Sequence, residues 1–308
     1  MQFYMAPMEG ITGYIYRAAY HKSFGNIDRY FAPFIMSKKL NQKEIRDILP
    51  ENNQGMELIP QILANRAEDF LAIAKAIESY GYKKVNLNLG CPSKTVVSKG
   101  RGSGFLAEPE RLDTFLEEIF EKTPIRISIK TRIGKESPEE FVRLLDIYNQ
   151  YPIEELIIHP RIQTDFYKNK PNWDMFEYAG THSRHPLCYN GDICTTEEYE
   201  RICQRFPGVS VVMIGRGILK NPGLVLAIRQ GTQLEKERLR AFHDEIYREY
   251  QEVLFGEKTV LFKMKELWFY LASLFTNYEK YAKKIKKAEK LKVYETVVDA
   301  LFEEQELR

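Results

Sequence analysis

Residues 85–94 join an alternating, β-prone run to a thiol in an unusual turn. The run ends in Gly90, Cys91 and Pro92, with Asn88 three residues before the cysteine. Proline disfavours helical backbone at the residue before it, and glycine permits a tight turn. A lone cysteine is most often packing material. This turn instead favours a thiol at the end of a strand, facing a cleft, where it could take part in chemistry.

A basic, glycine-rich loop follows at residues 99–104, with the sequence Lys-Gly-Arg-Gly-Ser-Gly. Glycines let the backbone approach a ligand closely, and successive backbone N–H groups can bind an anion. We therefore expect this loop to be able to contact an anionic ligand.

The composition indicates a globular enzyme. The 308 residues, 44% of them hydrophobic, can form one large domain and a smaller one, and the net charge of +2 does not by itself indicate nucleic-acid binding. The four cysteines contain no CxxC pair, so we expect no metal site, no disulfide framework and a reducing compartment. Neither a secretion signal nor an apolar run of membrane length is visible, so we expect a cytoplasmic protein without membrane contact.

Short β-prone runs recur about every 30 residues along the first three quarters of the chain. We predict strands at residues 3–6, 30–35, 57–61, 84–88, 125–130, 155–159, 187–190 and 210–214. Helical patterning follows most of them: an apolar stripe over 67–80, a proline that opens a helix at 109, and capping-box patterns at 137–140 and 195–198. Residues 41–55 are predicted to be an irregular loop.

Strands that alternate with helices predict an α/β fold with a parallel sheet, and eight such units close a (β/α)8 TIM barrel. We assign this barrel to residues 1–232. Strand signals then vanish, and helical stretches at 234–255, 258–277 and 278–304 predict a smaller, all-helical C-terminal domain at 233–308. The alternative is an open doubly wound sheet, but no G-x-G-x-x-G follows the first strand and no Walker-type loop is present.

In such a barrel, the residues after the carboxyl ends of the strands build the active site. Here those positions share a polar, glycine-containing character. In chain order they are Pro7, Met8 and Glu9, then Gln61, Asn88, Cys91, Lys130, Arg132, His159, Arg161, Asn190, Gly191, Asp192, Gly215 and Arg216.

The loops after the last two strands of barrel enzymes commonly bind a phosphate, and Arg216 offers charge-assisted donors there. Gln61 and Lys130 could hydrogen-bond a polar heterocycle and stabilise negative charge on it. Flavin mononucleotide (FMN) has both parts. Each signal is weak alone, since an Asn-Gly-Asp is usually only a turn, but their joint placement at successive strand ends favours a flavin site.

These residues resemble those of the tRNA-dihydrouridine synthase family. The matching motifs cover the barrel in the family's order: 6–10 (Ala-Pro-Met-Glu-Gly), 87–92 (Leu-Asn-Leu-Gly-Cys-Pro), Gly102 with Leu106, Lys130-x-Arg132-x-Gly134, His159-x-Arg161, 190–193 (Asn-Gly-Asp-Ile) and 214–217 (Ile-Gly-Arg-Gly). Two positions depart from the family pattern, Gly13 in place of an aspartate and Ile162 in place of a threonine.

The resemblance implies an FMN-bound barrel that reduces uridine in tRNA with NADPH or NADH. It implies that Cys91 is the catalytic acid and that Asn88, Arg132 and Arg161 bind the substrate. The implied FMN ligands are Pro7, Met8, Glu9, Gln61, Lys130, His159, Asn190, Gly191, Asp192, Gly215 and Arg216. The reaction adds hydride to C6 of uracil and a proton to C5, and a thiol with an ordinary pKa near ~8.5 can supply that proton.

A base within folded RNA must be flipped out to reach a barrel mouth, and the enzyme also needs a surface for the RNA backbone. Residues 258–292 contain ten lysines against three acids, a local net charge of +7 in a chain of +2. Interleaved with them are Trp268, Tyr270, Tyr278 and Tyr281. Lysine-rich helices can simply be solvated faces, but next to a barrel of this kind we expect contact with tRNA phosphates.

The nearest alternative is an FMN-dependent reductase or dehydrogenase of a free pyrimidine, although a free base needs no basic helical surface. A non-catalytic RNA-binding protein would not explain Cys91, Lys130 and His159 together. A phosphate-binding isomerase barrel would not explain the Gly90-Cys91-Pro92 turn. The sequence leaves open which tRNA uridine is reduced and which nicotinamide is used, and a monomer is our expectation for the oligomeric state.

Overall fold

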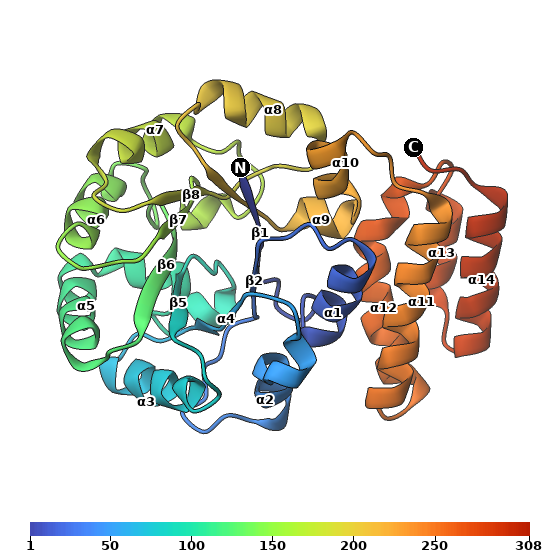
Figure 1. Ribbon diagram of the computed structural model, residues 1–308, viewed down its shortest axis with the longest axis horizontal. Coiled ribbons are helices and arrows are strands. Elements are labelled where there is room, and N and C mark those ends of the chain that lie inside the picture. The colour runs from blue at the N-terminus through green and yellow to red at the C-terminus, as the bar shows by residue number, and fades with distance from the viewer. The chain divides into compact units, whose positions relative to one another are not determined.

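The computed structural model describes all 308 residues of the chain (Figure 1). The chain forms two compact units, each made of segments that are distant in sequence. Unit 1 comprises Met1–Pro7, Asp28–Gly191 and Ile202–Met213, and unit 2 comprises Met8–Ile27, Asp192–Arg201 and Ile214–Arg308.

The strands form one parallel sheet that curls into a nearly closed barrel. They are β1 (Gln2–Met5), β2 (Arg29–Phe31), β3 (Leu58–Ile59), β4 (Gln61–Ile62), β5 (Lys84–Leu89), β6 (Arg126–Arg132), β7 (Leu156–His159), β8 (Leu187–Tyr189) and β9 (Val211–Ile214). Their order is β3-β2-β1-β9-β8-β7-β6-β5-β4, and a parallel bridge joins Ile62 of β4 to Ile35, in the segment that follows β2. The predicted α/β barrel is confirmed.

The ninth strand arises because the third predicted strand is divided at Pro60. Proline has no N–H to donate, so it interrupts the ladder of hydrogen bonds. On its two sides, β3 pairs with β2 and β4 pairs with β5. The Pro60 carbonyl still accepts from the Asn86 N–H at 2.9 Å. The two short strands β3 and β4 therefore take the place of one barrel strand between β2 and β5.

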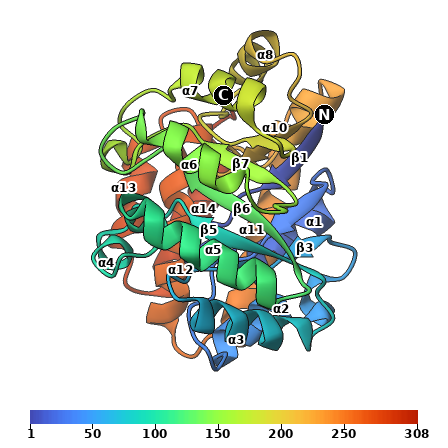
Figure 2. The same cartoon turned by 90° about the vertical axis from the view of Figure 1, so that its left-hand side faces the viewer.

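The helices of unit 1 lie along the outside of the strands, as Figures 1 and 2 show for α3, α5 and α6. They are α2 (Gln42–Ile48), α3 (Ala67–Glu78), α4 (Lys94–Val97), α5 (Pro109–Lys122), α6 (Glu140–Tyr148) and α7 (Trp173–His182). Side chains that fill a barrel interior come from alternate positions of the strands. One such buried cluster contains Tyr4, Ala6, Phe31, Ile59, Ile157, Cys188, Val211 and Met213.

The prediction of an irregular loop at residues 41–55 is wrong. Helix α2 occupies Gln42–Ile48, and a 3-10 turn follows at Pro50–Asn53. The Asn41 side chain accepts from the Glu44 N–H at 3.0 Å, and the Glu44 carboxylate accepts from the Asn41 N–H at 2.9 Å. This complete capping box stabilises a helix too short to show apolar periodicity.

The capping box predicted at residues 137–140 forms only in part. The Glu140 carboxylate accepts from the Ser137 N–H at 2.9 Å and from the Lys135 N–H at 2.7 Å. The Glu140 N–H, however, donates to the Ser137 carbonyl, because α6 begins two residues later than the pattern predicts.

Unit 2 contains α1 (Tyr14–Ser23), α9 (Arg216–Lys220), α10 (Leu224–Gln230), α11 (Lys236–Val253), α12 (Glu257–Leu271), α13 (Glu279–Lys287) and α14 (Leu291–Glu304), and α8 (Thr196–Arg205) begins in it. Helix α11 packs on α1 through Phe242, whose ring meets Tyr16, Tyr20 and Phe24 edge-on. The predicted helix at 278–304 is interrupted by extended backbone at Ala288 and Lys290. The domain boundary expected at residue 232 stays a prediction. None of the helices is long and apolar enough to span a membrane.

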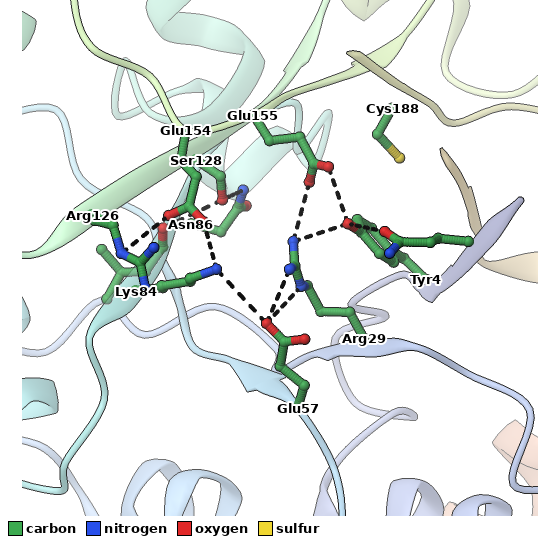
Figure 3. A network of polar contacts seen from close by, with 12 residues as sticks. Tyr4, Arg29, Glu57, Lys84, Asn86, Arg126, Ser128, Glu154, Glu155 and Cys188 are labelled. Atoms are coloured by element: carbon green, nitrogen blue, oxygen red, sulfur yellow. Dashed lines mark hydrogen bonds and ion pairs between the residues drawn. The ribbon is translucent and has the colours of Figure 1, made fainter. Parts of the chain in front are cut away.

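A network of charged side chains closes the amino end of the barrel (Figure 3). Its members are Tyr4, Arg29, Glu57, Lys84, Arg126, Glu154 and Glu155. The Arg29 guanidinium donates to the Tyr4 hydroxyl at 2.9 Å and lies 3.6 Å from the Glu155 carboxylate. Burial raises the pKa of Glu155, and Arg29 opposes that effect. Every charge in this network faces an opposite charge, as is typical of a region that stabilises the fold.

Candidate active site

The Cys91 turn is held by hydrogen bonds to both sides of the thiol. The Asn88 side-chain oxygen accepts from the N–H groups of Gly90 and Cys91, at 3.0 and 2.9 Å. On the other side, the Cys91 carbonyl accepts from the Ser103 N–H at 3.1 Å and from its hydroxyl at 2.8 Å. The backbone is therefore fixed while the thiol side chain stays half-buried at the carboxyl end of β5.

The glycine-rich loop at 99–104 packs against this turn. Gly102 has a φ of +56°, and a Cβ there would lie 2.8 Å from the Cys91 carbonyl oxygen. A larger residue would displace the turn, so this glycine is needed for packing. Asn65 donates to the Lys99 and Gly100 carbonyls at 2.9 and 3.1 Å, which ties the loop down. Anion binding by the loop stays a prediction.

A chain of buried side-chain amides runs through the barrel below the turn. Asn88 donates to the Gln61 side-chain oxygen at 2.7 Å, and Gln61 donates to the Asn86 side-chain oxygen at 2.7 Å. Asn86 in turn donates to the Ser128 hydroxyl at 2.9 Å (Figure 3). Because an amide presents its oxygen on one side and its NH₂ group on the other, the chain fixes which way Gln61 points.

Lys130 differs from the paired charges at the amino end of the barrel. It lies on β6 directly opposite Asn88 on β5. Its ammonium makes no hydrogen bond or ion pair within the chain, whereas the amides beside it are satisfied by one another. Burial, reinforced by the charge of Arg132, lowers the pKa of Lys130 to about 8. The ammonium is thus mostly charged at neutral pH and available to a ligand.

Arg132, expected to bind the pyrimidine, is fully buried and bound to backbone carbonyls. Its guanidinium donates to the Gly90 carbonyl at 3.0 Å and to the Ile162 and Phe166 carbonyls at 2.8 Å each. Burial lowers its pKa. Arg132 therefore joins the Cys91 turn to the loop after β7, and direct binding of a substrate by Arg132 stays a prediction.

His159 and Arg161 lie together at the end of β7. An Arg161 guanidinium nitrogen is 2.9 Å from His159 Nε2, and arginine can only donate, so Nε2 accepts and the proton lies on Nδ1. Arg161 also donates to the Asn169 carbonyl at 2.6 Å. The Tyr167 ring, 45% exposed, lies 6.0 Å from the His159 ring and 5.5 Å from the Arg132 guanidinium carbon.

The remaining predicted site residues lie close to the positions where the chain passes from one unit to the other. In unit 1, Asn190 donates to the Met213 carbonyl at 2.8 Å. In unit 2, the Arg216 guanidinium donates to the Asp192 carboxylate at 2.6 Å, and the Met8 N–H donates to the Thr12 hydroxyl at 2.7 Å. Gly215 precedes the short helix α9, and Glu9 is exposed. Pro7 ends the first segment of unit 1, and Gly191 ends the second.

A family model described as "Dihydrouridine synthase (Dus)" matches residues 4–307, which is nearly the whole chain. The chain belongs to this family. Two similar proteins are named tRNA-dihydrouridine(16) synthase: one from Pseudomonas putida, 27% identical over 79% of this chain and 78% of its own, and one from Aquipseudomonas alcaligenes, 29% identical over 76% and 78%. A probable tRNA-dihydrouridine synthase of Staphylococcus aureus is 27% identical over 81% of this chain and 78% of its own.

Solved structures similar to this chain support the barrel fold. Morphinone reductase in complex with tetrahydroNAD superposes with a TM-score of 0.54 at 13% identity, covering 78% of this chain and 90% of that one. The old yellow enzyme homologue from Zymomonas mobilis gives 0.54 at 11% identity, covering 78% and 92%. Membership of the family makes the chain a flavin-dependent oxidoreductase.

The residues of unit 1 fit a flavin on the basis of their own chemistry. A flavin ring offers carbonyl oxygens and ring nitrogens that gain negative charge on reduction. The unpaired Lys130 ammonium and the oriented Gln61 amide are donors suited to such atoms, and no other group in the chain satisfies that ammonium.

Three residues of unit 1 were missed in the sequence. Asn86 and Ser128 face each other in the register of β5 and β6, and only that register brings them to Gln61. Their signal was the alternation Asn86-x-Asn88, which places both amides on one face of the strand. Tyr167 lies in a loop without periodicity, and nothing in the sequence distinguishes it.

Proposed function

We propose that the protein is a tRNA-dihydrouridine synthase that reduces the C5=C6 bond of a D-loop uridine in tRNA. The observation that carries the proposal is the Cys91 thiol, held at the end of β5, on the strand whose Asn88 faces the unpaired Lys130. A proton donor and a cation for a flavin are the two groups that this reduction requires from the protein.

FMN is the proposed flavin, with NADPH or NADH as the electron donor. When bound, FMN supplies the hydride that adds to C6 of the uracil. Gln61, Lys130 and His159 would bind its ring and polar atoms. The resemblance adds Pro7, Met8, Glu9, Asn190, Gly191, Asp192, Gly215 and Arg216 as FMN ligands.

Cys91 is proposed to donate the proton to C5. A neutral thiol is needed for this step, and the Cys91 backbone is held so that the thiol returns to one place after each turnover. Asn88 and Arg132 support the step by holding the backbone at Gly90 and Cys91. Binding of the pyrimidine by Asn88, Arg132 and Arg161 remains part of the proposal.

The tRNA is proposed to approach with the target uridine flipped out of its stack, in the cytoplasm where tRNA is modified. The local charge of +7 over residues 258–292 would bind the RNA phosphates, so affinity should fall with salt. Position 16 is the first position to examine, because two relatives are named for it.

The proposal is tested by mapping dihydrouridine by mass spectrometry in tRNA from source cells with and without the gene. Loss at one D-loop position is expected, restored by the wild-type gene and not by a Cys91→Ala gene. Restoration by Cys91→Ala would contradict the catalytic assignment. Unchanged tRNA, together with activity of the purified protein on free uracil, would replace tRNA by a free pyrimidine as the substrate.

A further inference from the structure

An apolar groove of about 750 Å³ lies between helices α12 and α13 of unit 2. Sites for small organic ligands typically have volumes of about 300–1,000 Å³. The lining side chains are Ile11, Phe262, Lys265, Glu266, Trp268, Phe269, Tyr270, Ala272, Tyr278, Ala282, Lys283, Ile285 and Lys286.

Two phenylalanines of α12 are exposed at this groove. Phe262 is 59% exposed and Phe269 is 79% exposed, and their spacing of two helical turns places both on one face. Trp268 is only 2% exposed, and its indole N–H donates to the Tyr294 hydroxyl at 2.8 Å. The groove thus combines a fixed aromatic residue with two largely exposed phenylalanine rings, of which Phe262 lies 5.5 Å from the Lys263 ammonium and Phe269 meets the Tyr270 ring at 5.0 Å.

The charges at the groove leave an excess of positive potential. Glu266 is paired with Lys263 at 2.8 Å, and Lys265 donates to the Ala288 carbonyl at 2.5 Å. Lys283 and Lys286 are exposed and have no ion-pair partner. An anionic partner would complement them, whereas an apolar or cationic partner would leave them uncompensated.

The groove is continuous with a loop that is predicted to bind FMN. Ile11, one of its lining residues, is three residues after Met8. The Lys263 ammonium donates to the Gly10 carbonyl at 2.6 Å, which ties the loop to α12. The groove and Met8, a predicted FMN ligand, therefore belong to the same unit of the structure.

We propose that the groove binds an unstacked base of the tRNA other than the uridine that is reduced. This inference rests on the proposed function and adds a second nucleotide-binding site to it. The base stacks on Phe269 or Phe262, and Lys283 and Lys286 bind the adjoining phosphates. Aromatic stacking next to free lysines is the usual chemistry of single-stranded RNA recognition.

The test compares Phe269→Ala and Phe262→Ala with Phe255→Ala in the full-length protein. Phe255 is 100% exposed and does not line the groove, so it controls for the loss of an exposed ring. A stacked base contributes about 1–3 kcal/mol, so we expect tRNA affinity to fall about 5- to 150-fold in Phe269→Ala and not in Phe255→Ala. Flavin content and melting temperature should be unchanged in all three.

The lysines are tested by Lys283→Gln and Lys286→Gln. Each lost phosphate contact should reduce the slope of log affinity against log salt by about 0.7–0.9. The salt slope should be unchanged in Phe269→Ala, because stacking releases no counterions.

Wild-type tRNA affinity in both Phe269→Ala and Phe262→Ala would overturn the proposal. Unchanged tRNA affinity, combined with loss of self-association in Phe269→Ala, would reassign the groove to a second copy of the chain. Failure of the proposed function would give a different result. Neither the wild type nor any variant would form dihydrouridine, although Phe269→Ala would still weaken tRNA binding.

Discussion

The two ends of the barrel in unit 1 both carry buried charges, but they use them differently. At the amino end, Arg29 faces Tyr4, Glu57 and Glu155, so the charges satisfy one another. At the carboxyl end, Lys130 has no partner in the chain. Burying an unpaired ammonium destabilises a fold, whereas in a paired network the attraction between opposite charges offsets the cost of burial.

This difference indicates the purpose of each end. A charge that the protein buries and leaves unpaired is most simply explained by a ligand that pairs with it. Arg132, the other buried cation on β6, is instead satisfied by the chain itself, because it donates to the Gly90 and Ile162 carbonyls. We infer that the amino end stabilises the barrel and that the carboxyl end is arranged for chemistry.

Replacing Cys91 by alanine should have the largest effect. Loss of a positioned proton donor typically lowers a rate by about 10²- to 10⁴-fold, and the turn is held by backbone groups that alanine retains. The rate of dihydrouridine formation in tRNA should fall by at least about 10²-fold, while the flavin content stays constant. The matched control is Cys203→Ala, a half-buried thiol of α8, which should react at the wild-type rate. Equal rates in both variants would contradict the assignment of Cys91.

Arg29→Leu should destabilise the protein without loss of flavin affinity. It removes the cation that offsets the burial of Glu155, and breaking a buried pair in this way costs about 3–5 kcal/mol. The measurement is chemical denaturation of the apoprotein, with flavin titration of the folded fraction. A flavin affinity that fell as much as the stability would mean that the two ends are not separable.

Lys130→Met should show the opposite pattern. Flavin affinity should fall about 10- to 100-fold, as expected for one charge-assisted hydrogen bond, and apoprotein stability should not decrease, because no partner is lost. The same denaturation and titration experiments measure both quantities. A large loss of apoprotein stability would show that Lys130 has a structural role and would remove the contrast between the two ends.

The pH dependence sharpens the contrast. The folded-state pKa of Lys130, about 8, is lower than the value near 10.5 of an unfolded lysine, so between these pH values the unfolded chain binds more protons. Burial of the ammonium therefore lowers the free energy of unfolding below pH 8, and this destabilisation is relieved as the pH rises towards 10. Wild-type apoprotein should gain stability relative to Lys130→Met across this window, while its flavin affinity falls. If the stability of the wild type and of Lys130→Met changed equally with pH, the lowered pKa of Lys130 would be contradicted.

Asn86→Ala should have the smallest effect. It removes the acceptor of the Gln61 NH₂ group, so the Gln61 amide is then held only by the hydrogen bond from Asn88. We expect a shift in the flavin absorption spectrum or reduction potential and a few-fold loss of rate, with Cys91 unaffected. Ser128→Ala, which lies one hydrogen bond further along the chain, should give a smaller shift. An unchanged spectrum in Asn86→Ala would show that Gln61 is oriented by other contacts.

The barrel was predictable because its strands carry strong β-prone runs and its helices begin at visible signals such as Pro109. Prediction was wrong where a helix was too short for periodicity, as at Gln42–Ile48, although the Asn41 and Glu44 capping pair was visible. The division of a strand at Pro60 follows from the missing N–H and could have been foreseen.

The sequence identified single residues of the site but not the contacts between them. Motifs identified Cys91 and Lys130, but the partners of Arg132 are backbone carbonyls, which no side-chain pattern reveals. The same limit applies to the basic helices. Trp268, one of the aromatic residues interleaved with the lysines, is buried, whereas Phe269 beside it is exposed. Burial depends on which helices meet, and that is a property of the fold.

The most direct test of the central claim compares substrates for the purified, flavin-loaded protein. Unmodified tRNA transcript and free uridine would each be incubated with NADPH, and dihydrouridine would be measured and mapped by mass spectrometry. The account predicts product at one D-loop position of the transcript and little from free uridine. If the protein reduced free uridine rapidly and left the transcript without dihydrouridine, the account would be contradicted. The protein would then be a reductase of small pyrimidines.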